Sequence, residues 1–500
     1  MKTQMNFAYL DIANNGISDT IPTWFWDLPF ELYYLNLSCN QIKGRLPNLS
    51  IKFSNVEIFD FSSNNFEGLL PLFSTNLTTL NLSNNKFSGL NSFLCTAVVS
   101  SLNYLDLSKN RLFGGLPDSF LRWKELRIMN LANNNLSGEI PISMGSLIWL
   151  RALDLSNNSF LGELPLSLRN CTMLSFINLS EIVFSGKLQA WIGESLLYLV
   201  ILNLRSNKFY GSIPLQLCQL AQIQFLDLSQ NNISGNIPRC LYNLSTMAHE
   251  NSNNTIVLVA DFIILVGTQF IFYGGNYVVD TIVSWKGNSY HHGKNFKEMR
   301  SIDLSNNKLT GEIPEEISSL KGLLALNLSR HMLTGLIPQK IGYLTQLESL
   351  DLSRNQLFGS IPVSIADISF LEVLNLSYNK LSGRIPTGTQ IQIADPSGFI
   401  GNLALCGPPL TQNCPGDVTP NAESTKGGSK NYQEDEDEFL KCLYFGMGFG
   451  FVVGFWGICG FLMLNRSWRH IYFLSLINLK DWLYVTMMVN TARLQRMFHS

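Results

Sequence analysis

The chain has 500 residues, of which 46% are hydrophobic and 14% are charged, and its formal net charge is −2. Such a chain can bury a large apolar core, and its nearly balanced charge argues against a surface that follows nucleic-acid phosphates, which is usually basic. We therefore expect no nucleic-acid partner.

One phrase, Leu-x-Leu-Ser-x-Asn-x-Leu-x-Gly-x-Ile-Pro with variation, recurs from residue 10 to residue 386. Successive copies follow at a nearly constant spacing, which lies within the range of leucine-rich repeats. The Asn position, called here the corner position, falls at 15, 40, 64, 85, 110, 134, 158, 182, 207, 231, 307, 331, 355 and 379. The sequence therefore predicts an α/β solenoid, a plant-type leucine-rich-repeat superhelix with short parallel strands.

Within each repeat, the alternating Leu-x-Leu predicts a short strand whose leucines face inward and whose other residues line a concave surface. The corner Asn is a scaffold residue, because its amide can bond backbone groups where the chain leaves the strand. Ile182 and His331 replace it in two repeats. We expect those two turns to be locally less stable.

The repeats are interrupted between the tenth and eleventh copies, where the corner position moves from 231 to 307. The extra segment, called here the island, is rich in β-branched and aromatic residues. Charged residues such as Asp261 and Lys286 make it a poor membrane span. The expected organisation is repeats 1–10 at 1–244, the island at 245–297, repeats 11–14 at 298–390, a cysteine cap at 391–416, an acidic juxtamembrane linker at 417–441, a transmembrane helix at 442–464 and a cytoplasmic tail at 465–500.

Two pairs among the nine cysteines have spacings that suggest disulfides. Cys406 and Cys414 follow the last repeat and would close a loop over the exposed end of the core. Cys218 and Cys240 fall on the convex side of adjacent repeats and could join them. The other cysteines of the repeats have no obvious partner, and small buried side chains are the simpler interpretation.

An uncharged apolar run covers residues 442–464, which is long enough to span a bilayer. Acidic residues 434–438 precede it, and Arg466 and Arg469 follow it. Basic residues favour the cytoplasmic side. We therefore expect a single-pass plasma-membrane protein with extracellular repeats and a cytoplasmic C-terminus.

Sequons for N-glycosylation are frequent, as in a secreted domain. Asn-Leu-Ser at 36, 81, 178, 327 and 375 is also the repeat consensus, so these sites would face the concave side. The candidate acceptors are Asn36, Asn48, Asn76, Asn81, Asn135, Asn157, Asn170, Asn178, Asn232, Asn243, Asn253, Asn327 and Asn375.

These features together resemble the plant leucine-rich-repeat receptor-like proteins. The resemblance rests on Tyr277-x8-Lys286-Gly287 in the island, the Gly-x-Ile-Pro repeats, the cysteine cap, the acidic linker, one span and a short basic tail. The tail segment from Trp468 to Phe473 looks like the branch that detects fungal ethylene-inducing xylanase. The resemblance implies a receptor without a kinase that binds a microbial or peptide ligand through its repeats and island.

The same resemblance implies recruited partners. Gly446, Gly450 and Gly454 would pack against the span of an adaptor receptor kinase, together with the acidic linker. A co-receptor kinase would dock on the last repeats, at about 302–386. Tyr484 and Met487 fit a Tyr-x-x-apolar sorting signal. Simpler interpretations are glycines tolerated in a span, a solvated acidic spacer and an amphipathic tail helix on the inner leaflet.

No catalytic, cofactor or metal motif is found, and the segment after the span, 465–500, is too short for a kinase domain. The expectation is therefore a non-enzymatic receptor. The chain reaches a repeat strand by Leu10 without a signal segment or an N-terminal cysteine pair, which suggests a truncated product. Alternatives are a developmental peptide co-receptor, a non-signalling fragment or an inhibitor scaffold, the last disfavoured by the span.

Overall fold

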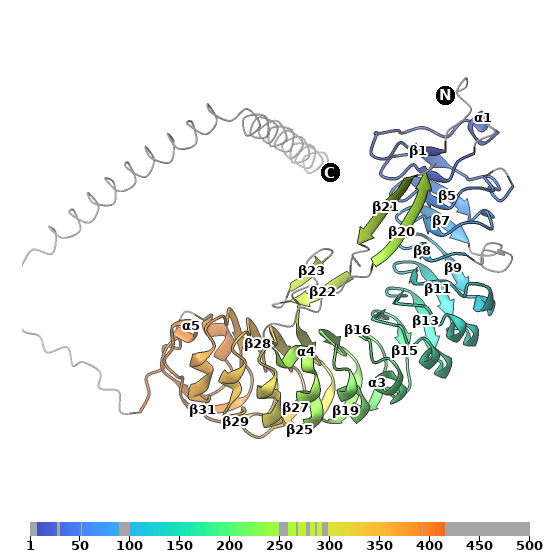
Figure 1. Ribbon diagram of the computed structural model, residues 1–500. Helices are drawn as coiled ribbons and strands as arrows, with labels where there is room; N and C mark the ends of the chain where they lie inside the picture. The colour runs from blue at the N-terminus through green and yellow to red at the C-terminus, as the bar shows by residue number, and fades with distance from the viewer. Residues whose placement is uncertain are drawn as a thin grey trace, which may run out of the picture. The chain divides into compact units, whose positions relative to one another are not determined.

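The computed structural model describes residues 8–27, 31–51, 53–89, 101–249, 259–266, 269–276, 281–285, 288–292, 299–392 and 394–415. Within this part, the repeats stack side by side and their first strands form one parallel sheet (Figure 1). Its 14 strands are β1 Tyr9–Asp11, β2 Tyr34–Asn36, β4 Ile58–Asp60, β6 Thr79–Asn81, β8 Tyr104–Asp106, β10 Ile128–Asn130, β12 Ala152–Asp154, β14 Phe176–Asn178, β16 Ile201–Asn203, β18 Phe225–Asp227, β24 Ser301–Asp303, β26 Ala325–Asn327, β28 Ser349–Asp351 and β30 Val373–Asn375. The predicted solenoid with parallel strands is confirmed.

Second strands follow the corner of each repeat and form lateral parallel sheets that the sequence did not predict. The Gly-x-Ile-Pro half of the repeat contributes to them, and Gly162 at φ +90° shows why glycine is needed there. The strands are β3 Lys43–Gly44, β5 Asn65–Leu69, β7 Lys86–Gly89, β9 Phe113–Gly115, β11 Asn135–Gly138, β13 Ser159–Gly162, β15 Val183–Phe184, β17 Tyr210–Ser212, β19 Asn232–Asn236, β25 Lys308–Glu312, β27 Met332–Thr334, β29 Phe358–Gly359, β31 Lys380–Arg384 and β32 Ala404–Cys406.

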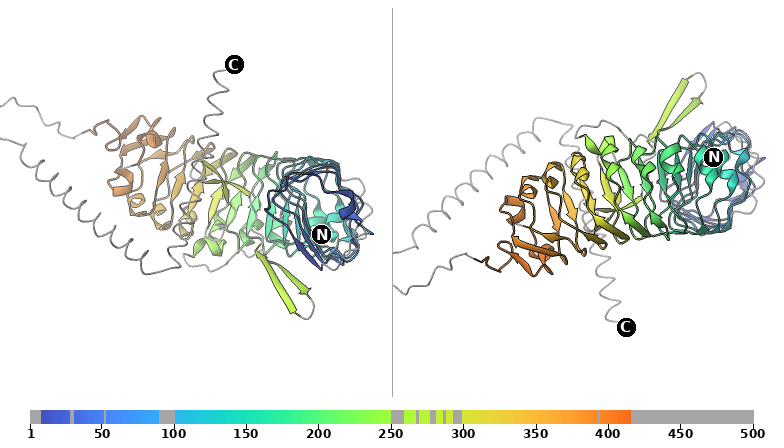
Figure 2. Two further views of the ribbon diagram at one scale, coloured as in Figure 1. Left: turned by 90° about the horizontal axis from the view of Figure 1, so that it is seen from above. Right: turned by 90° about the horizontal axis from the view of Figure 1, so that it is seen from below.

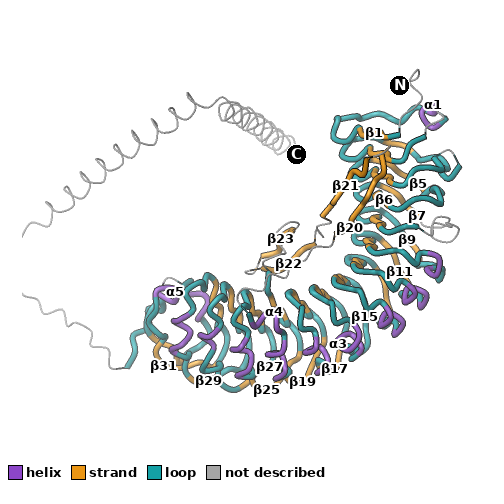
Figure 3. Tube along the Cα trace, in the orientation of Figure 1, coloured by secondary structure: helices purple, strands orange, loops and turns teal. Residues whose placement is uncertain are grey.

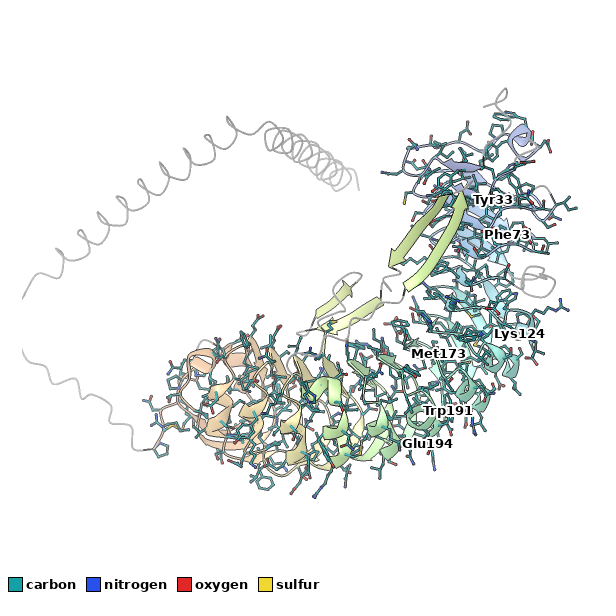
Figure 4. The ribbon with its side chains drawn as sticks, in the orientation of Figure 1. Tyr33, Phe73, Lys124, Met173, Trp191 and Glu194 are labelled. Atoms are coloured by element: carbon teal, nitrogen blue, oxygen red, sulfur yellow. A yellow bond between two sulfur atoms is a disulfide. The ribbon has the colours of Figure 1, made fainter. Side chains whose placement is uncertain are left out.

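Short helices cover the convex side, and most are 3-10 rather than α (Figure 3). In Figure 4, Trp191 and Glu194 belong to one of these helices; Trp191 is buried and Glu194 is exposed. The 3-10 helices are η1 Phe120–Arg122, η2 Ile142–Ser146, η3 Leu166–Asn170, η4 Leu215–Gln219, η5 Arg239–Asn243, η7 Glu315–Ser319, η8 Ile341–Tyr343, η9 Val363–Asp367 and η10 Pro396–Phe399. The α-helices are α1 Thr23–Trp26, α3 Trp191–Ser195, α4 Ser245–Ala248 and α5 Thr389–Gln392.

The core is a continuous column of leucines and phenylalanines inside the coil. Figure 2 shows the backbone of the first repeats nearly end-on. Leu105 and Leu107 of one repeat are both 0% exposed, as the alternating pattern requires. Each fully buried side chain of this size contributes about 1.5 to 3 kcal/mol. No repeat could bury this face alone, so stacking is what stabilises the chain.

The corner asparagines tie neighbouring repeats together. Asn207 Nδ2 donates hydrogen bonds to the carbonyl oxygens of Leu179, Leu204 and Arg205 at 2.7, 3.1 and 3.2 Å. Its Oδ1 accepts the amide of Phe184 at 3.0 Å. The same pattern recurs along the solenoid, which supports the expected scaffold role.

The two substituted corners differ from each other. Ile182 is 5% exposed and packs into the apolar core, so it replaces the lost hydrogen bonds with apolar contact. His331 is equally buried, but neither of its ring nitrogens has a hydrogen-bond partner. Of the two substituted corners, His331 therefore carries the larger free-energy penalty, because its buried ring nitrogens lack hydrogen bonds.

The island leaves the solenoid later than expected. Residues 245–248 form α4, in which Met247 is 0% exposed and its carbonyl accepts the amide of Gly322 from the following repeat. Because these contacts belong to the solenoid, the interruption begins after His249, and the core resumes at the buried Met299. Within the island, β20 Val259–Val266 pairs antiparallel with β21 Gln269–Asn276, and β22 Thr281–Trp285 pairs with β23 Asn288–His292.

The C-terminal end of the stack is closed by a pseudo-repeat. Cys406 and Cys414 form a disulfide with their Cα atoms 5.0 Å apart, and β32 pairs with β31. Asn402 acts as one further corner asparagine: its Nδ2 donates to the carbonyls of Leu376 and Phe399, and its Oδ1 accepts the amide of Leu381. Its place one ordinary repeat length after Asn379 was the signal that could have revealed it.

Several predicted sites lie outside the described residues. They are the span at 442–464 with Gly446, Gly450 and Gly454, the tail residues Tyr484 and Met487, the island residues Tyr277, Lys286 and Gly287, and Asn253. Over the part that the structure describes, no helix has the length and apolarity needed to cross a bilayer.

Candidate ligand-binding surface

Every strand of the concave sheet ends in Asp or Asn, and together these residues form a continuous row, called here the Asp/Asn row. Its members lie side by side because the strands are in register. They are Asp11, Asn36, Asp60, Asn81, Asp106, Asn130, Asp154, Asn178, Asn203, Asp227, Asp303, Asn327, Asp351 and Asn375.

Acid and amide alternate over most of this row, and the alternation has a direct physical role. Asn178 Nδ2 donates to Asp154 Oδ2 at 3.2 Å, and the hydroxyl of Ser156 donates to Asp154 Oδ1 at 2.7 Å. Asn375 and Asp351 repeat the arrangement at 3.2 Å. Because each carboxylate is bonded by its neighbours, the row is a structural part of the sheet and offers few free groups to a ligand.

The alternation fails at two places. Asn178 and Asn203 are register partners on β14 and β16, and Asp227 and Asp303 are register partners on β18 and β24. An acid thus faces an acid at the junction where the island is inserted. Burial, and then the charge of Asp303, raises the pKa of Asp227 to about 7, although the Ser229 bonds and Arg205 act in the opposite direction. Burial also raises the pKa of Asp303, against hydrogen bonds from Ser305 and Asn327.

The residues immediately before the strands form a second row that varies in chemistry and, apart from the buried Gln224, is more accessible. Arg127 and Arg151 lie in its middle part, whereas Glu348 and Glu372 lie at its C-terminal part. From its middle to its C-terminal end, the row therefore changes from basic to acidic. A ligand with complementary charges could be oriented by such a pattern.

The residue before each corner position has a left-handed backbone and adds to the same face. Arg354 and Tyr378 occupy this position in adjacent repeats at φ +56° and +55°. The Arg354 guanidinium lies 4.4 Å from the centre of the Tyr378 ring, which is 46% exposed. This pair presents an aromatic and cationic patch near the end of the repeats, of the kind that is frequent in protein interfaces.

The convex flank carries a groove of about 1180 Å³ where the island interrupts the repeats. The disulfide between Cys218 and Cys240, which joins adjacent repeats as the spacing suggested, lies in its wall. Glu312, Glu315 and Glu316 make one side acidic. Since the Glu315 carboxylate accepts the amide of Gln339, part of this charge serves to join repeats. In the described ranges, no cluster of His, Cys, Asp and Glu could hold a metal ion.

The sequons separate into two groups. Five of the sequon asparagines belong to the Asp/Asn row and are buried or half-buried. In each of them, Nδ2 donates a hydrogen bond to an Asp carboxylate of the preceding repeat. Seven others are exposed outside that row. The first group is Asn36, Asn81, Asn178, Asn327 and Asn375; the second is Asn48, Asn76, Asn135, Asn157, Asn170, Asn232 and Asn243.

We expect glycans on the exposed group and none on the row group in protein recovered from a secretory cell. A sugar on Asn178 would need space that its 2% exposure does not provide, and it would displace Nδ2 from Asp154. Peptide mapping by mass spectrometry after enzymatic deglycosylation in heavy-oxygen water measures each site. Occupied row sites in folded protein would contradict the assignment.

Family models for leucine-rich repeats match this chain at residues 100–160 and 297–357, and at 6–28, 76–96, 222–244 and 370–390. The protein is therefore a leucine-rich-repeat protein. It is 48% identical to tomato (Solanum lycopersicum) receptor-like protein EIX2 and 46% identical to EIX1. Both matches cover 99% of this chain and 48% of the relative. The chain belongs to the plant leucine-rich-repeat receptor-like proteins of the EIX type, and the resemblance seen in the sequence is confirmed.

The chain spans about half the length of the curated relatives that it matches. Among solved structures, it is similar to the ectodomain of the Arabidopsis receptor kinase HAESA bound to an extended IDA peptide hormone. The TM-score is 0.62 at 30% identity, covering 82% of this chain and 63% of that one. A HAESA complex with IDA and the co-receptor SERK1 gives a TM-score of 0.59 at 32% identity, covering 80% and 62%.

Proposed function

We propose that the chain is the ligand-binding and membrane-anchored part of a plasma-membrane receptor in plant immunity. Its repeats and island bind a microbial elicitor or a peptide outside the cell. An adaptor receptor kinase associates with the span and acidic linker, and a co-receptor kinase docks on the last repeats. These partners supply the catalytic output, because the receptor itself is not an enzyme.

The observation that carries this proposal is the chemistry of the concave face. The side chains of the Asp/Asn row are engaged in hydrogen bonds within the sheet. Ligand recognition therefore depends on the more variable row before the strands. That row changes sign between Arg151 and Glu372, and the exposed Tyr378 lies beside its acidic end. Variable charge and an exposed aromatic on a rigid sheet suit a protein or peptide ligand.

Binding of a purified fungal ethylene-inducing xylanase tests the proposal. The full chain, supplied with a secretion signal, is expressed in leaf cells, surface-labelled and titrated with the xylanase. We expect Arg151→Glu to weaken binding by about tenfold, or ~1.4 kcal/mol, through charge reversal in the variable row. Glu194→Lys on the convex helix α3 is the matched control and should leave binding unchanged.

Two other outcomes would redirect the assignment. The similarity to the HAESA ectodomain with its peptide hormone favours a developmental peptide receptor if the surface protein binds no xylanase but binds a plant peptide. Retention of the signal-bearing chain inside the cell would instead indicate a non-signalling fragment. Binding that is equally insensitive to both charge reversals would place recognition away from the concave row.

A further inference from the structure

Exposed aromatic side chains recur on the lateral sheets at one position of the repeat, three places after the corner. Phe113 on β9 is 55% exposed, Tyr210 on β17 is 45% exposed and Phe358 on β29 is 50% exposed. Half-exposed rings in a regular sheet leave apolar surface in water, and covering that surface would be favourable.

Two of these rings lie directly opposite a sequon asparagine. Phe113 is the register partner of Asn135, and Tyr210 is the register partner of Asn232. Both asparagines are exposed and belong to complete sequons, with Ser137 and Ser234 at the third position. Phe358, at the equivalent place, is opposite Lys380 and has no sequon beside it.

We propose that N-glycans on Asn135 and Asn232 lie over the rings of Phe113 and Tyr210 and cover them. Neighbouring strands are about 4.8 Å apart, and register partners in a parallel pair project from the same face of the sheet. The first sugar on Nδ2 therefore begins within reach of the adjacent ring. Its C–H groups carry partial positive charge and pack on the negative face of an aromatic ring.

The arrangement explains why the exposed aromatic surface is paired with a sequon at these two places. It also gives each glycan a fixed lateral position, so that the concave face stays open. The inference rests on the cell-surface placement proposed above, because N-glycans are added in the secretory pathway. It does not depend on which ligand is bound.

Hydroxyl-radical footprinting of the full chain, secreted from plant cells by an added signal and purified in detergent, measures the cover on each ring. Ser137→Ala removes the Asn135 sequon and should raise oxidation of Phe113 by about twofold or more, because a sugar over one face shields roughly half of an exposed ring. Ser234→Ala should do the same for Tyr210 alone. Phe358 should be unaffected by either change.

Ser137→Thr and Ser234→Thr keep the sequons and should keep the protection. If an alanine variant fails to fold, enzymatic trimming of the wild-type glycans replaces it. Trimming to a single sugar should preserve protection, whereas complete removal should abolish it. An unoccupied Asn135 and Asn232, or occupied sites whose removal leaves ring oxidation unchanged, would overturn the proposal. Either result is independent of ligand binding, and so it is separable from failure of the proposed function.

Discussion

Asp227→Asn is expected to stabilise the repeats on either side of the island at pH 7 and above. In the wild-type chain, Asp227 and Asp303 face each other in the Asp/Asn row, where every other acid has an amide as its following neighbour. The substitution removes one buried charge while leaving an Oδ1 atom to accept the Ser229 amide. We expect a gain of roughly 2 to 4 kcal/mol.

The sign of the pH dependence follows from the raised pKa. Burial and the neighbouring acid shift the pKa of Asp227 from 3.8 to about 7, so the folded chain binds more protons than the unfolded chain between these values. The stability of the wild type should therefore be highest below pH 4 with respect to this group and should fall as the pH rises to 7. Asp227→Asn should flatten this slope.

Hydrogen exchange of the β18 and β24 amides is the suitable measurement, because a solenoid opens locally rather than in one transition. Asp351→Asn is the matched control, since it removes the carboxylate that accepts Asn375 Nδ2 and should destabilise its own repeat. If the β18 and β24 amides show the same protection in Asp227→Asn as in the wild type at every pH from 4 to 8, the raised pKa of Asp227 does not affect stability at this junction.

The second large effect is expected from restoring the corner asparagine at residue 331. His331→Asn would supply a side-chain amide like that of Asn355, which donates to one carbonyl of the preceding repeat and one of its own repeat and accepts a backbone amide of the preceding repeat. The histidine leaves both ring nitrogens buried without a hydrogen bond. We expect the substitution to stabilise this turn by about 1 to 3 kcal/mol.

Histidine at this corner also makes the turn sensitive to acid. Burial lowers the pKa of His331 from 6.5 to about 4, although the nearby Asn307 and Leu304 carbonyls act in the opposite direction. A group whose folded pKa is depressed contributes its full stability above pH 6.5 and loses it as the pH falls toward 4, by about 3 kcal/mol here. His331→Asn should abolish that loss.

The test is hydrogen exchange at β25 and β27 in the wild type and the variant at pH 7 and pH 4.5. The same substitution at the exposed His249 provides the control and should leave the acid sensitivity intact. If the wild-type turn is as protected at pH 4.5 as at pH 7, the ring is either hydrated or charged in the folded chain.

Much of the architecture could be predicted from the sequence because the residue pattern of each repeat specifies its local structure. The alternating leucines set the buried face, the corner asparagine sets the turn, and the nearly constant period sets the stacking. The pairing of Cys406 with Cys414 could be expected for the same reason, since both residues are close in sequence. The lateral sheets were missed because their strands carry no alternating apolar pattern, as the exposed Phe113 shows.

The candidate surface could be predicted only in part. The sequence identified the residues of the Asp/Asn row but left open whether they bind a partner, and the structure shows Asn327 and Asn375 bonded to acids of the preceding repeats. It also could not separate Asn178, which is buried in that row, from Asn135, which is exposed on a lateral strand. Both read as complete sequons.

The sequence by itself determined the repeat, its strand and its corner, because these depend on contacts within one repeat or between successive copies of the same pattern. The recurrence of that pattern also indicated the class of protein. The tertiary structure alone decided which buried polar groups have hydrogen-bond partners and which acids lie next to another acid. Asp227 and Asp303 are separated in the chain by the whole island, and each looks like an ordinary consensus acid. The two carboxyl groups lie opposite each other only because β18 and β24, which flank the island in the chain, pair directly in the folded sheet.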